Sequence, residues 1–202
     1  MKRIILLSLA ALLAVSVSAQ SPEELAAQQA SLDSIFQAML NAKPSKEAKA
    51  EAKRLEKEGW KPQEGEKSIL QQIHESQVLA QEQMATADNT LTGRFLMQTA
   101  IQTSSAYTTA YATARAKAQA LLGGMIETKV KSQMEARMKN QELAGGNAAS
   151  ESEFKQRIQT LVKQSLRNCI PVLCIYRQLP NNLYEVQLRL AVDGKVLQLY
   201  NQ

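Results

Sequence analysis

The residue types that most often carry chemistry are few in this chain and lie far apart. Its only histidine, His74, is distant in sequence from its only two cysteines, Cys169 and Cys174. A transition-metal site needs several such ligands together, and a nucleophile needs a base beside it. The sequence also contains no glycine-rich phosphate loop and no nucleophile elbow. We therefore predict no catalytic residue, no metal site and no cofactor, and we expect the protein not to be an enzyme.

The two cysteines leave three possibilities open. Five residues of extended chain would span about 16 Å, whereas a disulfide needs Cα atoms roughly 4.4–6.8 Å apart. An intrachain disulfide between Cys169 and Cys174 would therefore need a turn or bulge near Pro171. Otherwise the two thiols are buried as small apolar side chains, or one of them forms a bridge to another chain.

Aromatic side chains are the remaining candidates for ligand contacts, although they make up only 4% of the chain. Trp60 is the only tryptophan and follows Gly59, which is placed to end a helix. Its ring is expected to pack over that helix end, and stacking on a ligand is the alternative. The possible ligand contacts are Trp60, Tyr107, Tyr111 and Tyr176. They would bind a ligand only if at least two of them lined one concave surface.

Residues 1–19 have the layout of a secretory signal peptide. Lys2 and Arg3 precede an apolar run over residues 4–15, and small residues stand before Gln20. A transmembrane anchor is the alternative, but it would need about 20 apolar residues. No cysteine follows the run to carry a lipid anchor. We predict cleavage after Ala19, export to the periplasm or outer cell envelope, and no membrane span in the mature chain.

The charge balance gives no reason to expect a nucleic-acid partner. The formal net charge is +5, and it falls to +3 when the two charges of Lys2 and Arg3 leave with the signal peptide. A nucleic-acid-binding domain has a stronger basic excess, gathered on one face or along one helix.

Residues 20–90 are predicted to form a helical N-terminal region. A first helix starts at Ser21 and ends before Pro44, and two more follow over residues 45–58 and 66–87. The first helix has an apolar stripe at helical spacing, formed by Leu32, Ile35, Phe36 and Met39. This stripe is the possible partner surface, through which the chain would bind itself or another envelope protein. The alternative is that the stripe docks on the chain's own domain.

Residues 91–202 are predicted to form an α+β domain. A period of two from Phe95 to Gln102 indicates a strand, and two further strands around a Pro-Asn-Asn turn, at 169–178 and 184–192, indicate a hairpin. Between them a long helix carries an apolar ridge at every fourth position, in which the first four residues are small: Ala106, Ala110, Ala114, Ala118 and Leu122. Because small side chains permit close approach, we expect this alanine-ridged helix to pack on a sheet of about three antiparallel strands.

Residues 125–138 can be interpreted in two ways. Apolar and polar residues alternate from Ile126 to Met134, as they would in a strand. Apolar residues also recur there at i+4 spacing, and the stretch from Lys131 to Leu143 is rich in good helix formers. We favour a helix that resumes after a kink at Gly123-Gly124.

Several stretches resemble proteins of bacterial envelopes. Residues 55–61 (LEKEGWK) resemble a signature of uncharacterised secreted proteins from Bacteroides-type bacteria. The Ala-rich run from Tyr107 to Leu122, followed by Ile175-Tyr-Arg and the stretch 184–190, is similar to the Lpp-twenty family of small envelope lipoproteins. The resemblance covers about residues 50–192 and implies an α+β domain at the cell envelope with no known reaction. This chain departs from the family because it lacks the lipidation cysteine, and no functional residue carries over.

The function expected from the sequence is a non-enzymatic structural or interaction role at the cell envelope. A ligand-binding module for an envelope component, such as a glycan or a lipid, is the alternative. A hydrolase with an unrecognised site is the third possibility.

Overall fold

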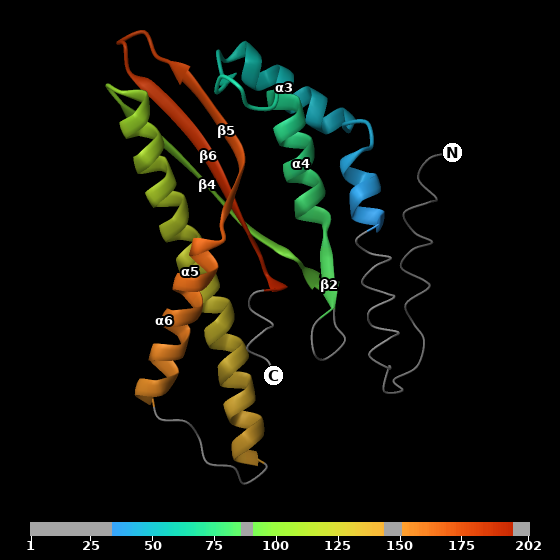
Figure 1. The fold of residues 1–202 in the computed structure, drawn as a ribbon, viewed down its shortest axis with the longest axis vertical. Helices are drawn as coiled ribbons and strands as arrows, with labels where there is room; N and C mark the ends of the chain where they lie inside the picture. The colour runs from blue at the N-terminus through green and yellow to red at the C-terminus, as the bar shows by residue number, and fades with distance from the viewer. Residues whose placement is uncertain (1–33, 86–90, 144–150, 196–202) are drawn as a thin grey trace. The chain divides into compact units, whose positions relative to one another are not determined.

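The computed structural model describes residues 34–85, 91–143 and 151–195 (Figure 1). The chain divides into two compact units, residues 1–39 and 40–202. The described residues of the first unit are helical from residue 34 onward, and this helix ends at residue 40. The predicted signal peptide and Leu32 lie outside the described residues. The second unit holds the sheets and the helices from α3 onward.

The main sheet is antiparallel and has the strand order β1-β5-β6-β4. Its strands are β1 (Lys61–Pro62), β4 (Phe95–Ser104), β5 (Ile170–Gln178) and β6 (Tyr184–Asp193). The α+β class, the strand from Phe95 and the hairpin are thereby confirmed. The two-residue strand β1 makes the sheet one strand wider than the sequence predicts, because so short a segment has no periodicity to recognise.

β4 and β6 pair without a break from Phe95↔Asp193 to Ser104↔Tyr184. Alternate side chains of β6 are buried on one face of the sheet, namely Val186, Leu188, Leu190 and Val192. Successive residues of a strand point to opposite faces, so Gln187 and Arg189 lie on the other face.

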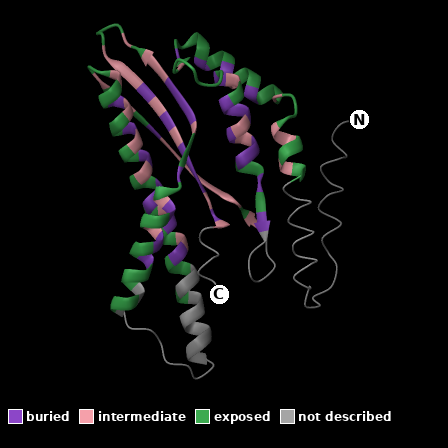
Figure 2. Cartoon of the chain, in the orientation of Figure 1, coloured by how far each residue is buried: buried purple, intermediate pink, exposed green. Residues whose placement is uncertain are grey.

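Helix α5 (Tyr107–Leu143) covers the face of the sheet that carries the buried residues of β6. Figure 2 shows buried residues interspersed with exposed ones along α5. Its ridge residues Ala110, Ala114, Ala118 and Leu122 are each 0% exposed. Ala106, predicted to belong to the same ridge, precedes the helix and is exposed. The absence of long side chains along the ridge allows the helix backbone to lie close to β4 and β6.

Residues 125–138 are helical, which decides between the two interpretations of this stretch. Gly123 and Gly124 both lie inside α5, which continues through them. Helix α6 (Glu151–Arg167) packs against α5 at this point. A Cβ atom on Gly123 would lie 3.5 Å from Leu166 and 3.6 Å from Val162, so α6 approaches the glycine to ordinary van der Waals contact.

Helices α3 (Lys46–Lys57) and α4 (Ile69–Gln81) pack on the opposite face of β5. Each starts at a serine whose hydroxyl accepts a backbone hydrogen bond, Ser45 from Ala48 and Ser68 from Gln71. The core on this face, called the second core below, consists of Ala48, Ala52, Leu55, Trp60, Ile69, Ile73, Leu173 and Ile175. The sheet is therefore covered by helices on both faces.

Helix α4 is shorter than the sequence predicts because the chain becomes extended at Glu82. Strand β2 (Gln83–Ala85) follows and pairs with β3 (Leu91–Gly93) in a small separate sheet. Because α3 and α4 form a core with β5, they belong to the same compact unit as the main sheet. That unit begins at residue 40.

Candidate ligand-binding surface

Four tyrosines meet where the first turn of α5 reaches the β5–β6 hairpin, and we call them the tyrosine cluster. Tyr107 and Tyr111 are one turn apart on α5, Tyr176 is on β5, and Tyr184 begins β6. The ring centroid of Tyr107 is 6.2 Å from that of Tyr111, 5.3 Å from that of Tyr176 and 6.5 Å from that of Tyr184. All four residues are half-buried, so each keeps part of its surface in contact with solvent.

Local geometry explains why these rings converge. Residues four apart on a helix share a face, which brings Tyr107 and Tyr111 together. In the β5–β6 ladder Tyr176 pairs with Val186, and Tyr184 lies two residues along β6 on the same side. Three of the four aromatic residues singled out in the sequence are thus brought together. Tyr184 was missed, although it begins the alternating run whose other apolar members face α5.

The cluster is polar at its hydroxyl groups, and Arg115 brings a guanidinium group beside it, since its Nη1 donates to the Tyr111 hydroxyl at 3.3 Å. The Tyr107 hydroxyl donates to Oε1 of Gln63 at 2.8 Å. Burial, and then the neighbouring Cys174, raise the pKa of Tyr107 above its ordinary value. Burial also raises the pKa of the Cys174 thiol, against the effect of its hydrogen bond with Tyr107. Such an arrangement suits a ligand that offers both hydroxyl groups and an apolar face.

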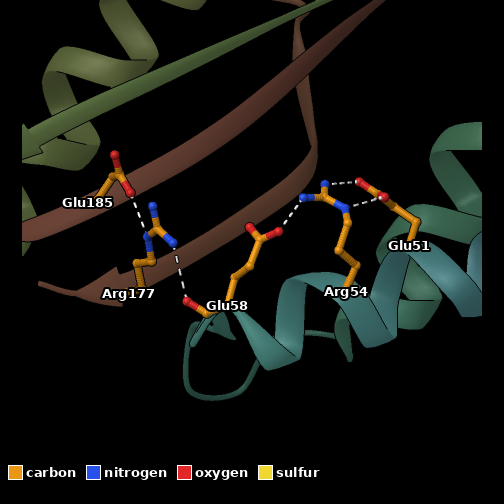
Figure 3. Close-up of polar contacts among 5 residues, drawn as sticks. All are labelled: Glu51, Arg54, Glu58, Arg177 and Glu185. Carbon is orange, nitrogen blue, oxygen red and sulfur yellow. Dashed lines mark hydrogen bonds and ion pairs between the residues drawn. The ribbon is translucent and has the colours of Figure 1, made fainter.

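Trp60 does not belong to this surface, contrary to the set of contacts suggested by the sequence. It is 5% exposed and packs in the second core, on the face of β5 that faces away from the cluster. Its ring is covered by the guanidinium group of Arg177, whose central carbon lies 4.7 Å from the ring centroid. Arg177 donates in turn to Glu185 at 2.6 Å and to the backbone carbonyl of Glu58 at 3.2 Å (Figure 3). Trp60 therefore packs between the end of α3 and the sheet and stabilises that contact.

Cys169 and Cys174 are both buried, and the disulfide considered for them is not formed. Nε2 of Gln119 lies 3.5 Å from Sγ of Cys169, whereas Cys174 contacts Tyr107. Tyr107 and Gln119 are separated by about 18 Å along α5, at a rise of roughly 1.5 Å per residue. The two thiols thus lie against different turns of the helix, too far apart to bond, and both serve as small core side chains.

The possible partner surface lies partly within the described helix of the first unit. Ile35 is 39% exposed there, and Phe36 and Met39 are half-buried. Leu32, the remaining member of the stripe, is outside the described residues. The three described members keep the helical spacing that places them on one side of the helix.

In the part of the chain that the structure describes, no three His, Cys, Asp or Glu side chains are grouped as metal ligands would be. None of the helices in that part combines the length and apolar character that crossing a bilayer requires.

No family model matches the chain, and no curated protein or solved structure is significantly similar to it. Function must therefore be argued from the chain's own geometry.

Proposed function

We propose that the protein is an exported, non-enzymatic interaction module of the cell envelope, and that its tyrosine cluster binds a glycan. The apolar leader at residues 1–19 supports export, and the envelope protein is then expected to begin at Gln20. A mass measurement on the protein recovered from the envelope checks that N-terminus.

The observation that carries the proposal is the convergence of four half-buried tyrosines from α5, β5 and β6. A sugar ring has one face rich in C–H groups and a rim of hydroxyl groups. Aromatic faces pack against the first, and phenol hydroxyls hydrogen-bond with the second.

Co-sedimentation of the mature chain with purified peptidoglycan sacculi tests the proposal. We expect Tyr111→Ala to weaken binding by about tenfold or more, as truncation of an aromatic anchor at the centre of a contact does. Leu121→Ala is the matched control, because Leu121 is a large exposed side chain on the same helix outside the cluster. Thermal unfolding of each variant verifies that it is folded.

Two results would contradict a glycan-binding cluster. If Tyr111→Ala and the control variant sediment equally with sacculi, the tyrosines do not form the binding surface. If the mature chain instead binds only vesicles of phosphatidylethanolamine and phosphatidylglycerol, the ligand is a lipid and the saccharide assignment is wrong.

A further inference from the structure

Arg189 projects from β6 on the face of the sheet opposite the tyrosine cluster and has no acidic partner. Its Nε donates to Oγ1 of Thr99 at 2.9 Å, and its Nη1 donates to Oγ of Ser76 at 2.7 Å. Both acceptors are neutral hydroxyl groups. Within the described residues Arg189 makes no ion pair.

The other half-buried arginines at the main sheet are neutralised. Arg94, directly before β4, forms an ion pair with Asp193 at 2.8 Å. Arg177 on β5 forms one with Glu185 at 2.6 Å. Of these three arginines at the sheet, Arg94 and Arg177 are therefore each paired with a carboxylate, and Arg189 is not.

The guanidinium group of Arg189 retains donor capacity. It carries five N–H groups, and only two of them donate to Thr99 and Ser76. Burial lowers the pKa of Arg189, and the charge of Glu51 opposes that effect without forming an ion pair. A partly desolvated cation whose partners are all neutral is stabilised when an anion joins it.

Two neighbours of Arg189 on this face are a half-buried glutamine and a solvent-exposed isoleucine. Gln187 lies two residues along β6, is half-buried, and its amide makes no hydrogen bond with the described residues. Ile101 pairs with Gln187 across the ladder, just as Thr99 pairs with Arg189. Ile101 is 45% exposed on the edge strand β4, so this part of the face is open to solvent.

We propose that Arg189, Gln187 and Ile101 form a binding site for a small organic carboxylate. The planar fork of the guanidinium group matches a carboxylate, which can accept two of its parallel N–H groups. Gln187 supplies a neutral donor beside it, and Ile101 supplies apolar surface for the rest of the ligand. An inorganic anion would make no use of that surface. The site is on the other side of the sheet from the tyrosine cluster and does not depend on the proposed function.

An NMR titration of the mature chain at constant ionic strength tests this site, with acetate, hexanoate and phosphate as separate probes. The resonance of the Arg189 Nε–H group is followed, and its assignment comes from its loss in Arg189→Lys. We expect a saturable shift, with hexanoate binding at least about tenfold more tightly than acetate because it carries four more methylene groups. Phosphate is expected to bind more weakly than hexanoate.

Variants separate binding from a structural role of Arg189. Arg189→Gln should weaken hexanoate binding by about tenfold or more, since it removes the charge and the fork. Lys131→Gln, which alters an exposed cation of α5 with its own carboxylate partner, should leave that affinity unchanged. The titration of the unaltered chain remains decisive should Arg189→Gln fail to fold. No shift at Arg189, or phosphate binding as tightly as hexanoate, would overturn the proposal.

Discussion

At the scale of single residues, the most strongly held charge is that of Arg94. Its guanidinium group donates to Asp193 through Nε at 3.0 Å and Nη2 at 2.8 Å, and pairs with Glu82 at 3.3 Å. The side chains of Arg94 and Glu82 are only 15% and 8% exposed. This group joins β4 to the end of β6 and to the segment after α4, so it links the main sheet to the connection that leads into it.

We therefore expect Arg94→Met to lower the free energy of unfolding by about 3 kcal/mol, because the partly buried carboxylates of Glu82 and Asp193 lose the cation they pair with. Arg54→Met provides the comparison, since Arg54 forms its ion pairs with Glu51 and Glu58 at the exposed surface of α3. That change should cost less than about 1 kcal/mol. Urea unfolding of the two variants measures the difference, and equal losses would contradict this view of Arg94.

The raised pKa of Tyr107 predicts a loss of stability in alkaline solution. The unfolded chain releases the phenol proton near its ordinary pKa of 10.0, whereas the folded chain keeps it to higher pH. Stability from this group is thus fully present below pH 10 and declines as the pH rises above that value. Tyr107→Phe removes the titrating group and should make the decline above pH 10 shallower, which urea unfolding at pH 8 and pH 10.5 would measure. Parallel declines in the two proteins would show that Tyr107 does not titrate differently on folding.

At the scale of secondary structure, the close packing of α5 on the sheet depends on the alanine ridge. Ala114 is 0% exposed, whereas Ala116, two residues along the same helix, is exposed. Ala114→Leu should destabilise the fold by about 1–3 kcal/mol because no space is left for three more carbon atoms. Ala116→Leu should change stability by no more than about 0.5 kcal/mol. Thermal unfolding distinguishes the two, and a tolerated Ala114→Leu would mean that the helix can move away from the sheet.

The elements that could be predicted from the sequence are those with a strong period. The alternation from Phe95, the alternation from Tyr184 and the i+4 spacing of the ridge each report which side of an element is buried, and each element formed as expected. Arg189 could not be placed in this way, and Trp60, expected to pack over a helix end, could not be linked to the arginine that covers it. Trp60 meets Arg177, and Arg189 meets Ser76, from segments far away in sequence. Such contacts are set by the packing of α3 and α4 on the sheet, which no local pattern records.

At the scale of the whole molecule, the division near residue 40 predicts that the second unit folds without the first. Both hydrophobic cores consist of residues from 40–202. A chain starting at Leu40 should therefore unfold in one cooperative thermal transition. Light scattering of this chain and of the mature chain from Gln20 then tests the apolar stripe as a partner surface.

If the stripe joins copies of the protein, the mature chain is an oligomer and the chain from Leu40 is a monomer. If the two have the same oligomeric state and the shorter one is less heat-stable, the stripe docks on the chain's own domain and the partner hypothesis fails.

The long ladder between β4 and β6 has a consequence for the speed of folding. It joins Phe95 to Asp193, with α5, α6 and β5 in the chain between them. Closing such a distant pairing costs chain entropy before any contact of the ladder forms, so folding is slower than in a helical bundle, whose contacts are local. The last strand must also leave the ribosome before the ladder can start. A newly made chain therefore stays unfolded for longer than a helical bundle would, which suits the export proposed above.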